Sequence, residues 1–262
     1  MTEESQDLQS IQSLKGVGPK SASLLNNLGI FTIPDAVMHL PFRYEDRSFI
    51  TPIGEANYQA PVLIEGEIMK SSVVFRGRRM LFTEIYDGTG KLTMRMFNFA
   101  MAQHKALEEG KMIRCYGSIT PGPNGKQMIH PQYQVFEKDV EIEIEENLTP
   151  IYPTTSGLQQ NKLKKIIEDS LRFCEEHDLL KENLNTGNYS EFGNLLETLK
   201  FLHKPPVNTD IEELIEGKHP AQKSLIKEEL IAHMLCAGIL KNELEGRTGP
   251  SMGNESEGEN HF

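Results

Sequence analysis

The stretch LFTEIYDGTGKLTMRMFNF, residues 81–99, decides the fold class of this 262-residue chain. Two runs of alternating side chains flank the tight-turn sequence Asp87-Gly88-Thr89-Gly90, so the stretch predicts a β-hairpin. Arg95 and Phe97 are two residues apart and therefore share a face of this hairpin. A cation beside an aromatic ring suits single-stranded or splayed nucleic acid, because phosphates attract charge and unpaired bases stack on flat rings.

The second strand of this hairpin has two unlike faces. One face is apolar and should line a barrel; it holds Leu92, Met94 and Met96. The other face holds Lys91, Thr93, Arg95, Phe97 and Phe99. We assign the charged and aromatic members of this second face to a nucleic-acid site, with Phe99, at the strand end, closer to the core than Phe97. The alternative for Phe97 is packing under the following helix or against another domain.

Strand periodicity continues on both sides of the hairpin. We predict five strands, at about residues 61–74, 79–86, 91–98, 111–119 and 126–135, with a short helix at about 100–108. Five strands with one helix after the third is the order of an OB-fold, a small Greek-key barrel that commonly binds oligonucleotides. The predicted fold class is therefore mixed α and β, a five-stranded OB-fold barrel flanked by helical segments.

Three arginines surround a glycine in VVFRGRR, residues 73–79, which we predict to be the loop between the first and second strands. Arg76, Arg78 and Arg79 are candidates for contacts with DNA, because the guanidinium fork matches phosphate oxygens and stacks on bases. A solvated hairpin tip is the alternative. The position at the 1–2 loop of an OB-fold favours binding.

A second candidate contact lies near the start of the chain, in the segment of residues 1–59. LKGVGPK, residues 14–20, precedes the helical sequence SASLLNNLG, a pattern typical of a helix-hairpin-helix motif. Amides at the helix start, with Lys20 beside them, would hold a phosphate. The alternative, which the shortness of the motif favours, is a helix-pair corner that packs against its neighbours.

After the predicted barrel domain, residues 60–138, the chain becomes acidic. Residues 139–146 alternate acidic and apolar side chains, which is consistent with an exposed strand or with a spacer. Pro150 and Pro153 then predict an extended connection, because each proline disfavours helix at the residue before it.

The acidic region continues as helices. Helical patterns fall at about residues 158–176, 190–202 and 220–243. The last of them carries apolar residues at helical spacing and should bury one face. We assign residues 139–245 to an acidic linker with helices, and we expect residues 246–262, mostly Gly, Ser, Asn and Glu, to be disordered.

Charge is unevenly distributed along the chain. The formal net charge is −11, yet residues 60–138 carry 11 basic and 7 acidic side chains, whereas residues 139–262 carry 12 and 24. Local charge decides where a polyanion docks, so the middle segment is the place for nucleic acid. No signal peptide or membrane-spanning run is present in the sequence, which predicts a cytoplasmic protein with no membrane partner.

Catalytic and metal-binding patterns are missing from the sequence. It contains no GxxxxGK[ST] phosphate loop, no acidic helicase box and no CxxC pair among its three cysteines, and its eight histidines do not fall at metal-ligand spacing. We therefore predict no catalytic residue, no metal site and no cofactor in this chain.

Several longer motifs carry a family resemblance. In chain order they are LKGVGPK at 14–20, HLPFRYEDRS at 39–48, GRRMLFTEIYDGTGKLTMRMFNF at 77–99, MIHPQY at 128–133, LTPIYPTT at 148–155 and HPAQKSLIKEELIAH at 219–233. Together they resemble the N-terminal part of the RecG family, bacterial ATP-dependent helicases that reverse stalled replication forks and migrate Holliday junctions.

The resemblance implies that the barrel is the family's wedge domain, which splits a DNA branch. It implies that Phe97 stacks on the base pair at the junction and that Arg76, Arg78 and Arg79 contact the backbone. The family usually has two adjacent aromatics where this chain has Met96-Phe97. Full-length members use ATP and Mg²⁺; here the resemblance fades near Asn242, so we expect no motor and no ATP hydrolysis.

Three functions follow from the sequence. We predict first a wedge module of a RecG-like helicase in DNA repair and recombination, which binds forks and Holliday junctions as a monomer near the bacterial nucleoid. The second is a fragment or subunit of a DNA helicase whose motor domains are supplied elsewhere. The third is a protein-interaction module that uses the acidic C-terminal half.

Overall fold

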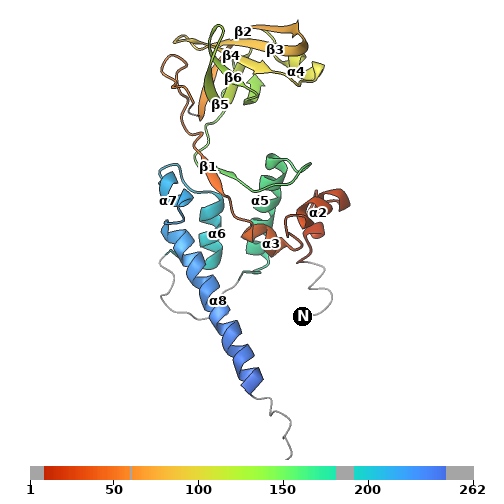
Figure 1. Ribbon diagram of the computed structural model, residues 1–262, viewed down its shortest axis with the longest axis vertical. Helices are drawn as coiled ribbons and strands as arrows, with labels where there is room; N and C mark the ends of the chain where they lie inside the picture. The colour runs from red at the N-terminus through yellow and green to blue at the C-terminus, as the bar shows by residue number, and fades with distance from the viewer. Residues whose placement is uncertain (1–8, 60, 181–191, 246–262) are drawn as a thin grey trace, which may run out of the picture.

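The computed structural model describes residues 9–59, 61–180 and 192–245 (Figure 1). The chain forms a barrel and a helical unit, joined by a narrower neck (Figure 1). The predicted tail, residues 246–262, lies outside the described residues.

The barrel consists of six strands and one short helix. They are β2 Pro61–Arg76, β3 Arg78–Tyr86, β4 Lys91–Met96, α4 Met101–Ala106, β5 Met112–Gly122, β6 Gly125–Ile129 and β7 Gln132–Phe136. The pairings run from β2 through β3, β4, β6 and β5 and return to β2; β4 and β6 are parallel, and the other pairs are antiparallel. This is the strand order of an OB-fold, so the predicted fold class is confirmed.

The barrel interior follows the alternation in β4. Leu92, Met94 and Met96 are buried in one cluster with residues such as Ile64 and Ile85. β2 reaches both sides of the barrel because it bends: its first residues pair with β5, and the rest pair with β3. At Gly66 a Cβ atom would lie 2.8 Å from the Tyr86 carbonyl oxygen, so only glycine allows this approach.

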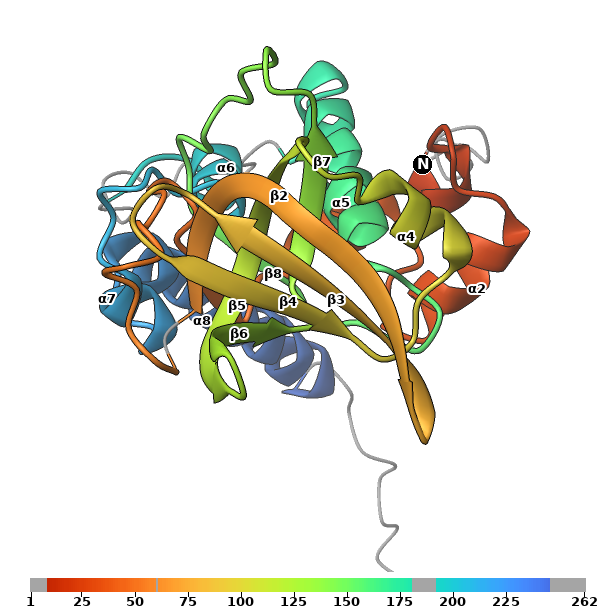
Figure 2. The same ribbon diagram turned by 90° about the horizontal axis from the view of Figure 1, so that it is seen from above.

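The first prediction to be corrected concerns residues 73–79. The arginine segment is not a loop, because β2 and β3 stay paired as far as Arg76 and Arg78, and Gly77 alone makes the turn. Val73, Val74 and Phe75 favour strand, while Gly77 supplies the positive φ of 74° that the turn requires. The result is a long hairpin that projects past the rest of the barrel (Figure 2).

The predicted fifth strand, residues 126–135, is in fact two strands, β6 and β7. The break lies at His130, which has a positive φ of 50°, and at Pro131, which has no amide hydrogen to donate to a ladder. β7 then continues along the same side of β5 as β6, with the register shifted by one residue, while β2 pairs with the opposite side of β5. β4 is also shorter than predicted and ends at Met96, before Phe97.

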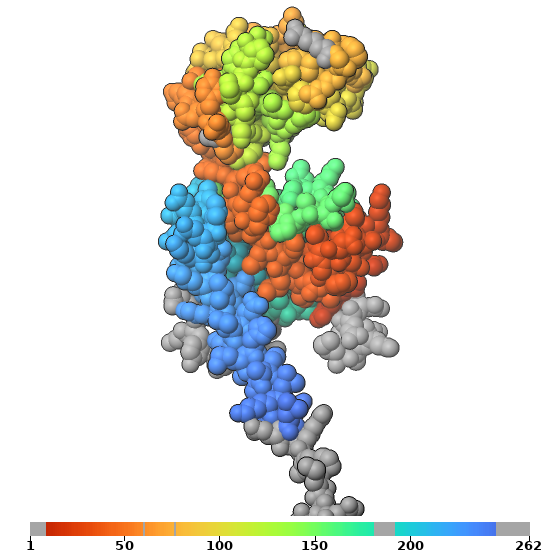
Figure 3. Space-filling model, in the orientation of Figure 1, coloured from red at the N-terminus to blue at the C-terminus, as the bar shows by residue number. Residues whose placement is uncertain are grey.

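The helical unit combines both ends of the described chain (Figure 3). Its elements are the 3₁₀ helix η1 Ile11–Ser13, α2 Pro19–Asn26, α3 Ile33–Met38, β1 Arg43–Glu45, β8 Thr149–Ile151, α5 Gln160–Glu176, α6 Leu195–His203, α7 Ile211–Ile215 and α8 Pro220–Glu245. β1 pairs with β8, and one hydrophobic cluster contains residues from η1 through α3 together with residues of α5 and α6. Neither the two short strands nor α7 was predicted.

The helix-hairpin-helix motif stays a prediction, because residues 1–8 lie outside the described part of the chain. Within the described residues, the 3₁₀ helix η1 precedes the glycine-containing turn and α2 follows it. Pro19 begins α2 as predicted. Leu14 and Val17 are buried in the core of the helical unit, which is what a packed corner requires.

Residues 139–146 form no strand and therefore act as a spacer. Arg114 of β5 fixes this spacer: Nη1 donates to the Glu143 carbonyl oxygen at 2.9 Å and Nη2 donates to the Ile142 carbonyl oxygen at 2.9 Å. The same guanidinium forms an ion pair with Glu65, at 2.7 Å between Nη2 and Oε2.

α8 is only partly covered. Ala221 and Ser224 are buried near its start. Further along, its large apolar side chains are exposed; they are Ile226, Leu230, Met234, Leu235, Ile239, Leu240 and Leu244. The expectation that this helix buries an apolar face therefore holds only for its first turns.

A series of buried hydrogen bonds stabilises the helical unit. His203 Nε2 lies 2.7 Å from the Val37 carbonyl oxygen, so this nitrogen carries the proton and donates. Nδ1 then accepts from the Tyr152 hydroxyl at 2.9 Å. Burial lowers the pKa of His203 from 6.5 to about 4, so the folded protein holds this imidazole neutral.

This arrangement predicts acid sensitivity. Between about pH 6.5 and 4 the unfolded chain binds a proton at His203 and the folded chain does not, so the free energy of unfolding falls as the pH is lowered through that window, by about 3 kcal/mol. His203→Gln keeps one donor and one acceptor and should remove this part of the pH dependence in urea unfolding. The exposed His233→Gln is the control; equal slopes for wild type and His203→Gln would contradict the prediction.

Candidate nucleic-acid interface

Three arginines without acidic partners gather at the hairpin end of the barrel. Arg78, Arg79 and Arg95 form no ion pair in the part of the chain that the structure describes. By contrast, four other arginines pair with carboxylates; they are Arg43, Arg47, Arg114 and Arg172. Guanidinium groups that no carboxylate neutralises are available for phosphates.

Phe97 lies at the centre of this group. The Arg78 guanidinium carbon is 3.8 Å from its ring centroid and that of Arg95 is 4.9 Å away. His130, directly after β6, supports the ring, with the centroids 5.3 Å apart, and its Nε2 accepts from the Phe97 amide at 3.2 Å. Phe97 is half-buried beside these groups and is absent from the barrel core. Its position matches the prediction of an outward aromatic beside a cation.

Arg79 and Phe99 form a second contact. The Arg79 guanidinium carbon lies 4.4 Å from the Phe99 centroid, and its Nη2 donates to the Phe99 carbonyl oxygen at 3.1 Å. Phe99 packs against the barrel core. The expectation that Phe99 lies nearer the core than Phe97 is therefore confirmed, and its role in binding stays a prediction.

A groove of about 280 Å³ adjoins Arg95 on the outer face of the barrel. Its lining includes Ser72, Val74, Met80, Phe82, Thr93 and the β5–β6 hairpin. Arg95 lies between two rings, because its guanidinium carbon is also 5.4 Å from the Phe82 centroid. Its Nη2 reaches only the Met80 sulfur, at 3.3 Å, and its Nε is buried without a hydrogen-bond partner among the described residues. A cation held this way still lacks an acceptor, which a phosphate oxygen or a base edge would supply.

Not all the predicted site residues meet. Lys91 is exposed at the far end of β4, opposite Tyr86, about 13 Å along the strand from Arg95. Lys20 is exposed on α2, in the helical unit. The backbone of Arg76 pairs with Arg78 at the hairpin tip, while its side chain lies outside the described part of the structure.

Sequence reasoning missed two residues of this site. Phe82 lies on the outer side of β3, between the buried Leu81 and Thr83, and the strand alternation alone would have found it. His130 is the second missed residue: its imidazole accepts a hydrogen bond from the Phe97 amide and so orients Phe97. Its role depends on the parallel pairing of β4 with β6, which brings together residues 33 positions apart.

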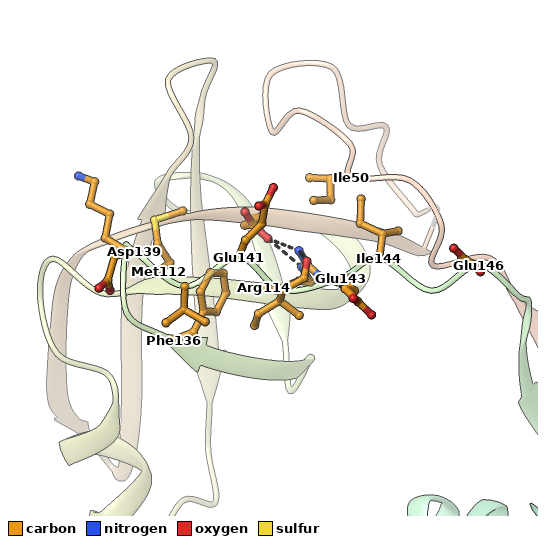
Figure 4. A pocket seen from close by; sticks show the side chains of 13 residues that line it. Ile50, Met112, Arg114, Phe136, Asp139, Glu141, Glu143, Ile144 and Glu146 are labelled. Atoms are coloured by element: carbon orange, nitrogen blue, oxygen red, sulfur yellow. Dashed lines mark hydrogen bonds and ion pairs between the residues drawn. The ribbon is translucent and has the colours of Figure 1, made fainter.

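A larger hollow, of about 910 Å³, lies on another part of the barrel surface, between β5 and the acidic spacer (Figure 4). Carboxylates line it; they belong to Glu65, Asp139, Glu141, Glu143 and Glu146. Arg114 lies among them, but its guanidinium is already paired with Glu65 and with the carbonyl oxygens of the spacer. This hollow repels phosphates and is a poor candidate for nucleic acid.

Among the described residues no group of three or more His, Cys, Asp or Glu side chains is placed to hold a metal ion. Within the same residues, none of the helices is long and apolar enough to cross a bilayer.

Known proteins similar to this chain point to one family. The family described as RecG wedge domain matches residues 10–174. The ATP-dependent DNA helicase RecG of Escherichia coli (strain K12) is 40% identical over 238 residues, which cover 90% of this chain and 34% of the relative. RecG of Haemophilus influenzae is 37% identical over 239 residues, again 90% of this chain and 34% of the relative.

A solved structure of RecG bound to a three-way DNA junction has a similar fold. Its TM-score is 0.67 at 23% identity, and the match covers 90% of this chain and 32% of that one. The chain thus spans about a third of the length of the curated relatives it matches.

The contact between His130 and Phe97 leads to a test of how this site is held. Without the imidazole the Phe97 amide loses its acceptor, worth about 1 kcal/mol, so His130→Ala should speed hydrogen exchange at that amide about fivefold. Amide exchange followed by NMR measures it, with His104→Ala on α4 as the control. Unchanged exchange at Phe97 would show that the imidazole does not hold the ring.

Proposed function

The chain belongs to the RecG wedge domain family, and on that premise we propose that its barrel binds branched DNA and holds apart the strands of a replication fork or Holliday junction. The observation that carries this proposal is the cluster of Arg78, Arg95 and Phe97, in which two cations that form no ion pair with any described residue flank one aromatic ring.

The cluster has the two groups that an opened duplex needs. At a branch point the last base pair exposes a flat face, and Phe97 offers a ring on which it stacks. The strands that separate there carry phosphates past the barrel, and the arginines neutralise them. Both groups lie at one end of the barrel, so a single DNA branch would meet them together.

Repulsion should orient the DNA. Residues 139–262 hold twice as many acidic as basic side chains, 24 against 12, whereas the hairpin carries no acid between residues 71 and 83. A polyanion that approaches this protein is therefore favoured at the hairpin end and disfavoured at the spacer.

We propose a second role for α8, because the curated relatives are about three times as long as this chain. Its exposed apolar side chains, from Ile226 to Leu244, would pack against the ATP-dependent motor of such a helicase. In this proposal ATP and Mg²⁺ act in the motor, and the wedge binds DNA without them. We further propose that the chain binds as a monomer, at bacterial chromosomal DNA in the cytoplasm.

The first test compares DNA shapes. We expect tighter binding to a fork and a three-way junction than to linear duplex of equal length, measured by fluorescence anisotropy without ATP. Phe97→Ala should weaken junction binding by about 1 to 3 kcal/mol, the usual contribution of stacking one base on a ring. Phe31→Ala, an exposed aromatic of the helical unit, is the matched control. Equal affinity of the wild type for all three DNAs would rule out a wedge.

The second test concerns charge. Arg78→Ala should lower the slope of log K against log salt by about one unit, because one phosphate contact is lost. Arg172→Ala removes an exposed arginine of α5 that pairs with Asp169 and should leave the slope unchanged. If Arg78→Ala weakens binding with an unaltered slope, this arginine supports Phe97 and does not bind phosphate.

A further inference from the structure

Phe75 is the most exposed large apolar side chain of the described residues, at 77% of its full accessible surface. It lies on β2 two residues before Gly77, the turn of the projecting hairpin (Figure 2). No ring and no cation of the described residues covers it. A solvent-exposed aromatic ring at the tip of a hairpin suggests that a binding partner outside this chain covers it.

The register of the hairpin shows which way Phe75 faces. Directly opposed residues of an antiparallel pair share a face, and neighbours along a strand alternate. Val74 opposes Met80, and both line the groove beside Arg95. Phe75 opposes Arg79 and therefore lies on the other face.

That other face begins as the interior of the barrel. Leu81, two residues from Arg79, is fully buried in the core. Val73, opposite Leu81, is already 38% exposed, and Phe75 is the next residue outward on the same face. The apolar inner face of the barrel thus continues past its end and emerges into solvent at Phe75.

The hairpin therefore has an arginine and an aromatic ring on each side. On the groove side Arg78 stacks on Phe97. On the other side Arg79 is held over Phe99, and the ring of Phe75 is free. The absence of any carboxylate between residues 71 and 83 makes both sides attractive to the same polyanion.

We propose that Phe75 is a second base-stacking residue, which takes an unpaired base of the strand that passes on the face opposite Phe97. This inference rests on the proposed binding of branched DNA and extends it: besides the base pair on Phe97, one separated strand has an aromatic contact of its own. A ring that stacks on an unpaired base opposes re-annealing, because that base must leave the ring before the duplex closes.

The test uses the whole chain and three forks: one with both arms single-stranded, and two with only one arm or only the other single-stranded. Bases of a duplex arm are not free to stack. Phe75→Ala should weaken binding to one of the one-armed forks by about 5- to 150-fold and leave the other within twofold of wild type. Phe97→Ala should weaken binding to all three forks alike, because the base pair on which its ring stacks is present in each.

Two further variants separate stacking from other effects. Phe75→Tyr keeps a ring and should bind as the wild type does, whereas Phe75→Leu keeps only apolar bulk and should behave as Phe75→Ala. The salt slope should not change, since no charge is lost. Phe31→Ala is again the control, and thermal unfolding verifies that each variant is folded.

The experiment separates failure of this inference from failure of the proposed function. If the wild-type chain does not prefer forks to duplex, both the proposed function and the stacking role of Phe75 are overturned. A wild-type chain that prefers forks, with Phe75→Ala equal to it on every fork, overturns only the stacking role of Phe75 and leaves a protein partner as the reason for its exposure. Equal losses on both one-armed forks, or full binding by Phe75→Leu, also overturn it.

Discussion

The backbone hydrogen-bond ladder along β2 is the interaction on which the rest of the structure depends. One end of this strand pairs with β5 and the other with β3, so a single continuous strand completes the barrel and builds the projecting hairpin. Because the ladder extends to the residues on either side of Gly77, the arginines there are attached to paired backbone. Cations held on a sheet lose less conformational freedom on binding than cations on a loose loop. The barrel is therefore both the support of the interface and the reason for its rigidity.

Acidic and basic side chains lie in different parts of this protein. The chain carries a formal charge of −11, and a polyanion would avoid it if the charges were mixed evenly. Instead, Arg114 holds the acidic spacer against β5 through the spacer's carbonyl groups, while Arg78, Arg79 and Arg95 form no ion pair among the described residues. His130 orients the aromatic ring of the site, because it accepts a hydrogen bond from the Phe97 amide and packs against the Phe97 ring. Charge and stacking surface are thus pre-arranged before any ligand arrives.

Much of the barrel was predictable from alternation and turn sequences, since side-chain period and tight turns are local properties. Leu92, Met94 and Met96 were correctly placed inside on that basis. The predictions were wrong where pairing between residues distant in the sequence determines the secondary structure. Residues 73–79 were expected to loop, because three arginines and a glycine suggest solvent, yet pairing across the hairpin extends the strands. The pairing of β1 with β8 joins segments about a hundred residues apart, and no local pattern announces it. For the same reason the sequence predicted the outward position of Phe97 and missed the imidazole that holds it.

The pairing of Glu45 with Thr149 has an evolutionary consequence. The chain leaves the helical unit at β1, traces the whole barrel and re-enters at β8, its immediate neighbour. The barrel is therefore an insertion whose two attachment points lie side by side, like a loop that has grown into a domain. Such an insertion adds little closure entropy to its host, because that cost rises only with the logarithm of loop length. Lineages could lengthen, shorten or exchange the barrel while the helical unit kept its own core, so the barrel surface could diversify independently of the rest of the chain.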